Sequence, residues 1–310
     1  DETRNQPAYR NRRRIIHGKP CQAPATGAAH PAGAVQAVMN APGNRYIFCV
    51  SPGRSGTHYL QQVFSCAKGV CAVHEPEHQF PEYAHLKPHL WDLRNTPLAS
   101  TASERRHAKL AQVNGILAST GAGIYAETNP LFSTLWHDVL LEALSDCELT
   151  IIILRRNASA VLKSLLDLGW FQGRDGNRWM VTAYSVNSPL KAPVSESRAS
   201  AAELIIGYLL NVESNARLIK RRCEQQGHGV IELYSQQLFE EKNAIEMLLS
   251  RTGLEPDMER LARLDADSRN KQTISKKSTD TPVEACRAEL DHYLDSCREY
   301  AIDIPDLYYL

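Results

Sequence analysis

The stretch RYIFCVSPGRSGTHYLQQVF, residues 45–64, contains the local pattern that decides the fold. Its first part, Arg45–Ser51, is a short apolar run of the kind that forms a buried strand. In the segment Thr57–Lys68, apolar side chains recur at intervals of three and four residues, which predicts a helix with one apolar face. The residues that make this pattern are Leu60, Val63, Phe64 and Ala67. A strand, a turn with Gly53 and Gly56, and a helix in this order are typical of an α/β protein with a parallel sheet.

The same alternation of short apolar runs and amphipathic segments continues to about residue 256. Further strands are expected at Val70–His74, Gly123–Glu127, Leu149–Arg155 and Val230–Tyr234. Further helices are expected at Arg105–Ala118, Leu131–Leu144, Ala158–Leu168, within Ala201–Gln226, and at Lys242–Thr252. This order predicts an α/β fold in which helices flank a parallel β-sheet. We expect residues 45–310 to form a single α/β domain.

Residues 1–44 differ in composition and are expected to form a disordered or linker-like basic arm. The first twenty residues carry six basic and two acidic side chains, and an Ala-, Pro- and Gly-rich stretch without hydrophobic periodicity follows. A solvated tail is the expected role, and a basic contact with an acidic partner is the alternative. Two further polar segments, 173–200 and 268–281, are expected to be loops.

The overall composition limits the classes of protein to which the chain can belong. Lysine plus arginine and aspartate plus glutamate each number 35, so the formal net charge is zero, which argues against a general nucleic-acid binder. No apolar run approaches the ~20 residues of a membrane-spanning helix. The eight cysteines form no C-x-x-C pair, and Cys49 and Cys66 lie in apolar segments where we expect them to be buried and reduced. These features predict a cytoplasmic protein, with the Golgi lumen and a removed anchor as the alternative.

The turn Ser51–Thr57, S-P-G-R-S-G-T, is a candidate phosphate-binding loop. A glycine-rich turn between a strand and a helix directs backbone N–H groups and a helix N-terminus toward one point, which suits a phosphate. Arg54 adds a guanidinium group, and Ser55 and Thr57 add hydroxyls. No lysine stands where the G-x-x-x-x-G-K-[ST] loop has one, which disfavours a magnesium-dependent NTPase. An ordinary strand-to-helix turn with a serine cap is the structural alternative.

A second candidate phosphate site lies in Leu154–Ser164, L-R-R-N-A-S-A-V-L-K-S, where a strand again runs into a helix. Arg156 leaves the strand at its carboxyl end, the edge at which ligands of open α/β sheets bind. Ser164 follows eight residues later, about two helical turns on, so that both side chains can face one ligand. Taken alone, this spacing is also compatible with charges at the rim of the sheet.

Together, the two segments resemble motifs of the sulfotransferase family, whose members use 3′-phosphoadenosine 5′-phosphosulfate (PAPS). Pro52–Leu60 is similar to the family's 5′-phosphosulfate loop, and Leu154–Ser164 is similar to its 3′-phosphate motif. Val230–Pro256 is a looser match to a third segment, in which residues 235–237, S-Q-Q, replace the family's acidic pair. The resemblance runs in order from about Arg45 to Pro256. It implies a P-loop NTPase-like sulfotransferase architecture.

The resemblance also implies roles for individual residues. Those expected to contact the donor are Gly53, Arg54, Ser55, Gly56, Thr57, His58, Arg156, Ser164 and Tyr234. The loop residues would hold the 5′-phosphosulfate, Arg156 and Ser164 the 3′-phosphate, and Tyr234 would lie near the adenine. An arginine in the loop, where the cytosolic phenol and steroid branch usually has lysine, resembles the carbohydrate, tyrosylprotein and many bacterial branches. PAPS is therefore the expected donor, and no metal is expected to be required.

The residues H-E-P-E-H, positions 74–78, follow the second expected strand and supply the candidate base. Sulfuryl transfer needs an acceptor hydroxyl to lose its proton, and a positioned carboxylate or imidazole can take it. In relatives with an arginine loop the base is a glutamate just beyond this strand, so the resemblance implies Glu75, with His74 as the second candidate. A carboxylate that merely caps a turn is the structural alternative.

The same five residues also match the H-E-x-x-H motif of zinc metalloproteases. In that motif both histidines lie on one helix and bind the metal. Pro76 lacks an N–H group and favours an extended conformation at Glu75. We therefore expect a strand end here and no metal site.

Polar residues also follow the strand expected at Gly123–Glu127. Glu127, Thr128 and Asn129 should reach the same edge of the sheet and are predicted to orient the acceptor, with a strand-end turn at Asn-Pro as the alternative. Aromatic residues after the second phosphate motif are either a wall for a sugar or aryl acceptor or ordinary core packing. They are Trp170, Phe171, Trp179 and Tyr184.

These patterns predict a sulfotransferase that moves a sulfuryl group from PAPS to the hydroxyl of a carbohydrate or small molecule. The predicted reaction is an in-line displacement with a glutamate base. Two alternatives from other classes stay open: a nucleotide kinase or NTPase on a related fold, and a non-catalytic nucleotide-binding module.

Overall fold

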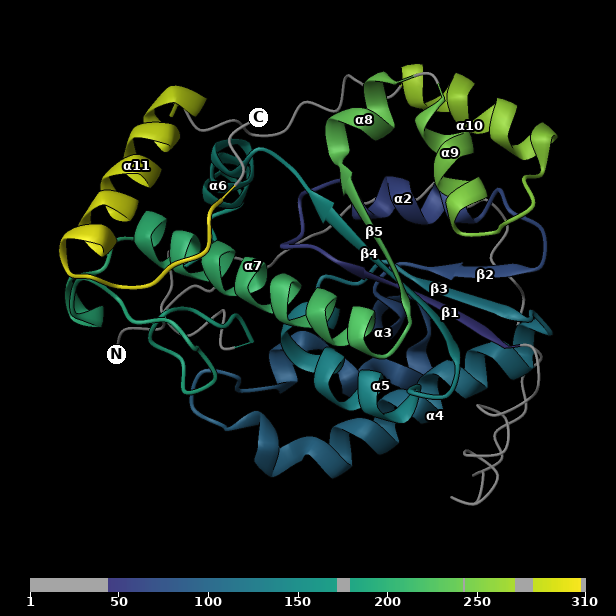
Figure 1. The fold of residues 1–310 in the computed structure, drawn as a ribbon, viewed down its shortest axis with the longest axis horizontal. Coiled ribbons are helices and arrows are strands. Elements are labelled where there is room, and N and C mark those ends of the chain that lie inside the picture. Colours follow the sequence, from purple (N-terminus) through teal and green to yellow (C-terminus); the bar gives the residue numbers. More distant parts are fainter. Residues whose placement is uncertain (1–43, 172–178, 242, 271–280, 308–310) are drawn as a thin grey trace, which may run out of the picture.

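The computed structural model describes residues 44–171, 179–241, 243–270 and 281–307, and its centre is an all-parallel β-sheet (Figure 1). The strands are β1 (Arg45–Val50), β2 (Val70–Val73), β3 (Ile124–Glu127), β4 (Glu148–Arg155) and β5 (Gly229–Tyr234). Their order across the sheet is β2-β3-β1-β4-β5. Because β1 pairs with both β3 and β4 in parallel, the turns that follow these three strands leave from one edge.

Helices cover both faces of this sheet. The α-helices are α2 (Thr57–Phe64), α3 (Pro76–Gln79), α4 (Ala102–Thr120), α5 (His137–Ala143), α6 (Ala158–Asp167), α7 (Ala201–Gln225), α8 (Ser235–Glu240), α9 (Ala244–Arg251), α10 (Met258–Asn270) and α11 (Val283–Glu299). Short 3₁₀ turns lie at Pro81–Leu86, Pro88–Leu90, Leu98–Thr101 and Glu196–Arg198, and a π-helical turn at Phe132–Trp136 precedes α5. In Figure 1, α2 and α8–α10 lie above the sheet, and α4, α5 and α7 lie below it.

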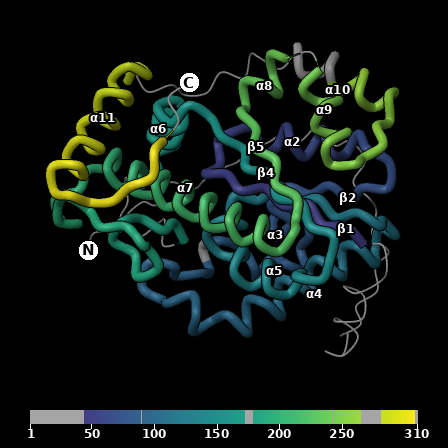
Figure 2. The backbone as a smooth tube through the Cα atoms, in the orientation of Figure 1, coloured from purple at the N-terminus to yellow at the C-terminus, as the bar shows by residue number. Residues whose placement is uncertain are grey.

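Side chains of β1 point alternately to the two faces of the sheet and belong to two apolar clusters, one on each face. Tyr46, Phe48 and Val50 of β1 pack with apolar residues of α4, α5 and α7, whereas Ile47 and Cys49 pack with residues of α2, α9 and α10. Successive strand residues point to opposite faces, so a fully apolar strand is buried on both. A third apolar cluster joins α6, α7 and α11, and the backbone trace in Figure 2 shows the yellow α11 beside α6.

Most of the expected elements are confirmed. All five strands lie where the apolar runs predicted them, and the apolar face of α2 is buried. Cys49 and Cys66 are buried, as expected. The sequence patterns did not predict the short α3 or the helices α8, α10 and α11, and residues 268–270 are helical instead of part of a loop.

Parts of the remaining expectations lie outside the described residues. These parts are the arm up to residue 43, residues 173–178 of the first polar segment, and residues 271–280 of the second. Trp170, Phe171 and Trp179 pack against the cluster of α6, α7 and α11, and the Tyr184 hydroxyl donates to the carbonyl of Val194 at 3.0 Å. The described aromatic residues therefore contribute to packing.

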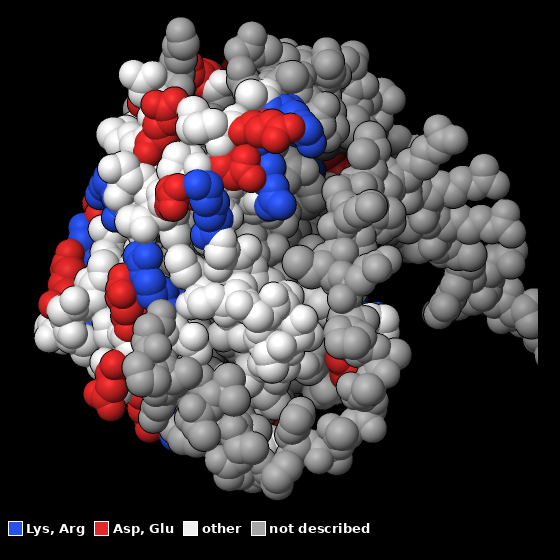
Figure 3. Space-filling view, turned by 90° about the vertical axis from the view of Figure 1, so that its right-hand side faces the viewer, with Lys and Arg blue, Asp and Glu red and all other residues white. Residues whose placement is uncertain are grey.

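The described surface carries mixed charge. On the face drawn in Figure 3, basic and acidic side chains lie interleaved, in agreement with the zero formal net charge of the sequence. Within the described ranges, no helix combines the length and apolar character needed to cross a bilayer.

Candidate active site

The turn after β1 is a tight loop that ends at the N-terminus of α2. Gly53, Arg54 and Gly56 all have positive φ, at 76°, 54° and 93°. The Ser55 hydroxyl donates to the carbonyl of Gly53 at 3.1 Å, and Ser51 accepts from the Gly53 N–H at 3.3 Å. Backbone turns of this kind, opening a helix, form concave sites for anions. The loop thus has the tight turn and the helix start that the sequence predicted, and its role in binding a phosphate stays a prediction.

Two arginines from separate turns meet beside this loop. The Arg54 Nε donates to the Ser164 hydroxyl at 3.0 Å, and the Arg156 Nη1 donates to the backbone carbonyl of Arg54 at 2.6 Å. Burial lowers the pKa of the Arg156 guanidinium, and the positive charge of Arg54 lowers it further. Like charges held this close repel each other, and a bound anion would relieve that repulsion.

Other contacts hold the two turns in place. Tyr208 of α7 donates its hydroxyl to the carbonyl of Pro52 at 2.9 Å. The Asn157 side chain caps α6 by accepting from the N–H of Ala160 at 3.0 Å. The neighbouring Arg155 forms ion pairs with Glu213 and Glu232, so its charge is matched inside the protein.

An aromatic pair stands next to the loop. The rings of Tyr59 and Phe239 stack with centroids 4.8 Å apart, and a Cβ atom on Gly56 would lie 3.3 Å from the Phe239 ring. Phe239 is 57% exposed, so its ring is accessible to a ligand beside the loop. Tyr234 is the last residue of β5 and the N-cap residue of α8. Phe239 belongs to α8, which therefore brings it against Tyr59 of α2. The placement of Tyr234 near the adenine stays a prediction, and sequence reasoning did not predict the stacked pair.

The candidate base lies at the end of β2 in a strained conformation. Glu75 has φ 50° and ψ 65°, and its side chain is 38% exposed. The Nε2 of His74 lies 3.8 Å from one of its carboxylate oxygens, and the Nδ1 of His78 lies 3.7 Å from the other. The ring of His58, which follows the loop directly, meets the ring of His74 edge-on at 5.5 Å. This contact places His74, the neighbour of Glu75, against the first turn of α2, which follows the loop.

The proton of His74 is assigned by its neighbours. Its Nδ1 lies 2.9 Å from the carbonyl oxygen of Thr128 and 3.1 Å from the Thr128 hydroxyl. Because a carbonyl oxygen only accepts, Nδ1 carries the proton and donates to it. In the neutral ring, Nε2 is then the acceptor nitrogen, and it lies on the side of Glu75.

The last residue of β3 and the two residues after it are buried and bonded inside the protein. Glu127 pairs with Lys109 at 2.6 Å and accepts from the Tyr125 hydroxyl at 2.7 Å. The Asn129 Nδ2 donates to both carboxylate oxygens of Glu77, at 3.2 and 3.1 Å. Their assignment to the acceptor stays a prediction, and the contacts that they make lie around the base.

Known proteins share the arrangement of this chain, but their sequences are remote. No family model matches the chain, and no curated protein matches it in sequence. Among solved structures, the sulfotransferase STF9 from Mycobacterium avium is similar over 85% of this chain and 80% of its own, with 12% identity and a TM-score of 0.50. The chain has the sulfotransferase fold. A sulfotransferase domain from the olefin synthase of Synechococcus PCC 7002 also matches, over 85% of this chain and 96% of its own, with 15% identity and a TM-score of 0.45.

Residues 74–78 do not form the single helix of a zinc metalloprotease motif. In the structure α3 begins at Pro76, and the left-handed conformation of Glu75 separates His74 from this helix. The two histidines therefore do not lie one turn apart on a single helix, as the zinc motif requires. Within the described part of the chain, no group of three histidine, cysteine or acidic side chains is placed to hold a metal ion.

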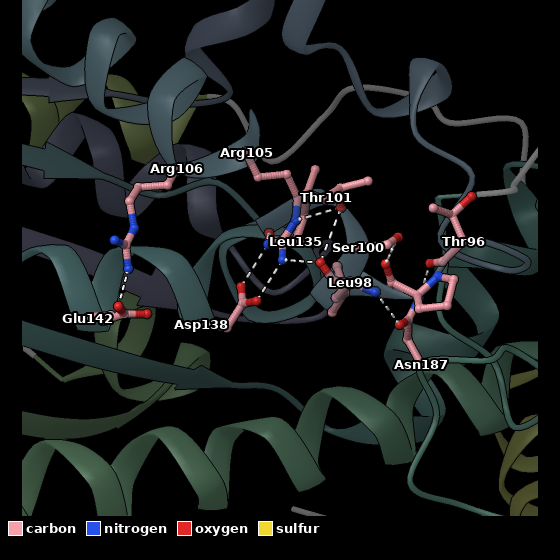
Figure 4. Close-up of polar contacts among 11 residues, drawn as sticks. Thr96, Leu98, Ser100, Thr101, Arg105, Arg106, Leu135, Asp138, Glu142 and Asn187 are labelled. Carbon is pink, nitrogen blue, oxygen red and sulfur yellow. Dashed lines mark hydrogen bonds and ion pairs between the residues drawn. The ribbon is translucent and has the colours of Figure 1, made fainter. Parts of the chain in front are cut away.

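Within the sulfotransferase fold, a buried arginine secures the chain that follows α3. Figure 4 shows Arg105 of α4 pointing at Asp138, with two contacts of 2.7 and 2.6 Å, and at the carbonyl of Leu98 at 2.9 Å. The Asn187 side chain donates to the carbonyls of Leu93 and Thr96, at 2.7 and 2.8 Å. These bonds fasten residues 93–101 to α4, to α5 and to the segment after residue 179. The chain beyond the candidate base is thus firmly held.

Glu77 provides a pH-dependent prediction. Burial raises its pKa from 4.5 to about 7, with Lys109 opposing the shift and Glu127 adding to it. A carboxyl group with a raised pKa stabilises the fold below pH 4.5 and loses that contribution as the pH rises to about 7. At pH 8 we expect the free energy of unfolding of Glu77→Gln to exceed that of the parent by about 1–3 kcal/mol, as measured by urea unfolding. At pH 5 the difference should be smaller. Parallel pH profiles for the two proteins would contradict this prediction.

Proposed function

We propose that this chain is a sulfotransferase that moves a sulfuryl group from PAPS to a hydroxyl acceptor. The observation that carries the proposal is the meeting of two turns 102 residues apart, in which the Arg156 guanidinium donates to the backbone carbonyl of Arg54 at 2.6 Å. The charge of the Arg54 side chain is close enough to lower the pKa of Arg156. A donor with phosphate groups at both its 3′ and 5′ positions matches two cationic sites side by side. Charge-assisted hydrogen bonds from arginine are among the strongest that a phosphate can accept.

In this proposal the donor lies between the two turns. The loop Gly53–Thr57 would hold the 5′-phosphosulfate, with His58 beside it, and Arg156 and Ser164 would hold the 3′-phosphate. The Ser164 oxygen accepts from Arg54, so its own O–H group can donate to a phosphate oxygen. Tyr234 and the stacked pair Tyr59 and Phe239 would contact the adenine, since bases stack well on aromatic rings.

The proposed reaction is an in-line displacement. Glu75 takes the proton of the acceptor hydroxyl as its oxygen attacks the sulfur, and the bond from sulfur to the bridging oxygen of the donor breaks. Arg54 and the loop N–H groups stabilise the negative charge that develops on that oxygen. His74, oriented by Thr128, is the second candidate for the base. Arg54 supplies the cation of this mechanism, so the proposal includes no metal ion.

The acceptor that we propose is the hydroxyl of a carbohydrate or small molecule. This assignment rests on the arginine of the loop and on the resemblance of Pro52–Leu60 to the carbohydrate branch. A cytoplasmic location stays a prediction. Its support is the burial of cysteines such as Cys49 and Cys66 as unpaired thiols among the described residues.

Donor binding tests the proposal before any acceptor is known. We expect 3′-phosphoadenosine 5′-phosphate (PAP) to raise the melting temperature without magnesium, with a stabilisation of ~2.7 kcal/mol at 100 times its Kd.

Arg156→Ala should weaken PAP binding by about 1–3 kcal/mol, because charge-assisted bonds to the 3′-phosphate are lost. Thermal shift and calorimetry measure both effects.

An arginine far along the chain from both turns provides the control. Arg298→Ala removes an exposed arginine of α11 and should leave PAP affinity unchanged. Stabilisation by ATP that requires magnesium would favour a kinase or NTPase instead. Equal PAP affinity of Arg156→Ala and the parent would refute the 3′-phosphate assignment. If PAP binds but no sulfuryl group moves from labelled PAPS to any member of a broad acceptor panel, the chain would be a non-catalytic nucleotide-binding module.

A further inference from the structure

Glu75 occupies a backbone conformation that an L-amino acid rarely adopts. Its φ of 50° and ψ of 65° lie in the left-handed region, which glycine tolerates and glutamate does not prefer. Such a residue keeps this conformation only when the surrounding structure holds it there. The contacts on both sides of Glu75 therefore decide where its carboxylate lies.

The residue before Glu75 is fastened to Thr128. The His74 Nδ1 donates to the Thr128 carbonyl at 2.9 Å, and the Thr128 N–H donates to the carbonyl of Val73 at 3.0 Å. Thr128 is completely buried, and the His74 side chain is only 16% exposed. The end of β2 is thus bonded twice to one residue.

The chain after Glu75 is fastened to the next residue, Asn129. The Asn129 Nδ2 donates to the Glu77 carboxylate at 3.2 and 3.1 Å, and both side chains are buried. The Asn129 Oδ1 accepts from the N–H of Leu131 at 3.0 Å, which fixes the orientation of the amide. Glu77 is therefore held by a donor that cannot turn away without losing its own bond.

The third residue in this series, Pro130, lies beside Gly53 of the loop that carries Arg54. A Cβ atom built on Gly53 would lie 3.5 Å from the Pro130 ring. Three consecutive residues thus lie against the chain before Glu75, the chain after Glu75, and the loop that carries Arg54. We name this segment, residues 128–130, the TNP bridge.

We propose that the TNP bridge is a positioning element that holds Glu75 in its left-handed conformation and sets its carboxylate relative to the loop of Arg54. Asn129 is then a positioning residue that acts through Glu77. The chemical meaning of this placement rests on the proposed sulfuryl transfer, in which a misplaced base slows the reaction steeply. The conformational part concerns the folded chain alone and can be tested without donor or acceptor.

The test compares glycine with alanine at position 75 in two backgrounds. In the parent, Glu75→Gly should be more stable than Glu75→Ala, because only alanine is strained at this φ. Asn129→Ser keeps an oxygen for the Leu131 N–H but is too short to reach Glu77. In the Asn129→Ser background residue 75 can relax. The ratio of the folding constant of Glu75→Gly to that of Glu75→Ala should therefore be at least about threefold smaller than in the parent background. The difference between glycine and alanine in the unfolded chain is the same in both backgrounds and cancels.

Urea unfolding of the four proteins measures this coupling. Glu77→Gln is the matched control, because its amide oxygen still accepts from Asn129 and the ratio should stay as in the parent. An equal ratio in the parent and Asn129→Ser backgrounds would overturn the proposal, as would the absence of any glycine advantage in the parent. If Asn129→Ser does not fold, Glu77→Ala removes the same contact from the other side.

Activity provides a second measurement. Asn129→Ser should lower sulfuryl transfer from PAPS by about tenfold or more while PAP affinity stays unchanged, and this loss should vanish when Glu75 is already glutamine. A purely structural effect would lower activity equally in both backgrounds and would refute the positioning role. Failure of PAP to bind would remove the proposed function, whereas the glycine–alanine comparison contains no nucleotide and decides the conformational part separately.

Discussion

Turnover is expected to fall at least ~10²-fold when Glu75 is replaced by glutamine, because the amide cannot take the proton of the acceptor hydroxyl. Glutamine has nearly the same size, so the loop of Arg54 and the turn of Arg156 should be undisturbed. PAP affinity, measured by calorimetry, should therefore equal that of the parent. Transfer of labelled sulfate from PAPS to an acceptor found in a broad hydroxyl panel measures the turnover.

Two variants show whether this loss belongs to Glu75 itself. Glu82→Gln changes an exposed carboxylate in the turn after α3 and should keep parental activity. His74→Gln removes the second candidate, whose Nε2 lies 3.8 Å from Glu75. A larger loss in His74→Gln than in Glu75→Gln would transfer the role of base to the histidine. Full activity of Glu75→Gln would exclude Glu75 from the mechanism.

Replacing Lys109 with methionine is expected to lower the free energy of unfolding by ~3–5 kcal/mol, since the substitution leaves Glu127 as a buried charge without its ion-pair partner. Lys109 is 1% exposed and donates to both Glu127 and Gln112 at 2.6 Å. Its ammonium also lies 5.4 Å from the centroid of the Trp136 ring. Urea unfolding at pH 7.5 measures the loss.

A double variant distinguishes the buried charge from the lost packing. Adding Glu127→Gln to Lys109→Met removes the unpaired carboxylate and should restore most of the stability, because neutral replacements of a buried pair are often well tolerated. Lys68→Met, which breaks an exposed pair with Glu255, should leave the unfolding midpoint near that of the parent. A small effect of Lys109→Met would mean that Glu127 gains a proton or another partner in the folded protein.

The sequence alone was sufficient to predict the strands and most of the helices around them. Apolar runs such as residues 149–155 and the spacing of Leu60, Val63 and Phe64 are local signals that tertiary structure did not override. The helices α3, α8, α10 and α11 were missed. In α10 polar residues dominate the pattern, and its role becomes visible only where Leu261 and Leu264 pack against the cluster of α2 and α9.

The two turns that carry Arg54 and Arg156 could also be found from sequence, because each combines a strand end, a helix start and a basic side chain within a few residues. Their meeting follows from the parallel pairing of β1 with β4, which places both turns at one edge of the sheet. The stacked pair of Tyr59 and Phe239 was not predicted. One of its members belongs to α8, and no local pattern in the sequence joins it to the loop.

The sequence determined the succession of strands and most helices along the chain, and it singled out the loop of Arg54 and the side chains of Glu75 and His74 as candidates. These signals depend on neighbours close along the chain. Only the tertiary structure decided which partners the residues at the end of β3 and directly after it bind. In the structure Glu127, Thr128 and Asn129 are buried and bonded to Lys109, His74 and Glu77, and their predicted role in orienting an acceptor stays a prediction. Burial and partner choice depend on side chains brought together from 18 to 54 residues away, and no local pattern carries that information.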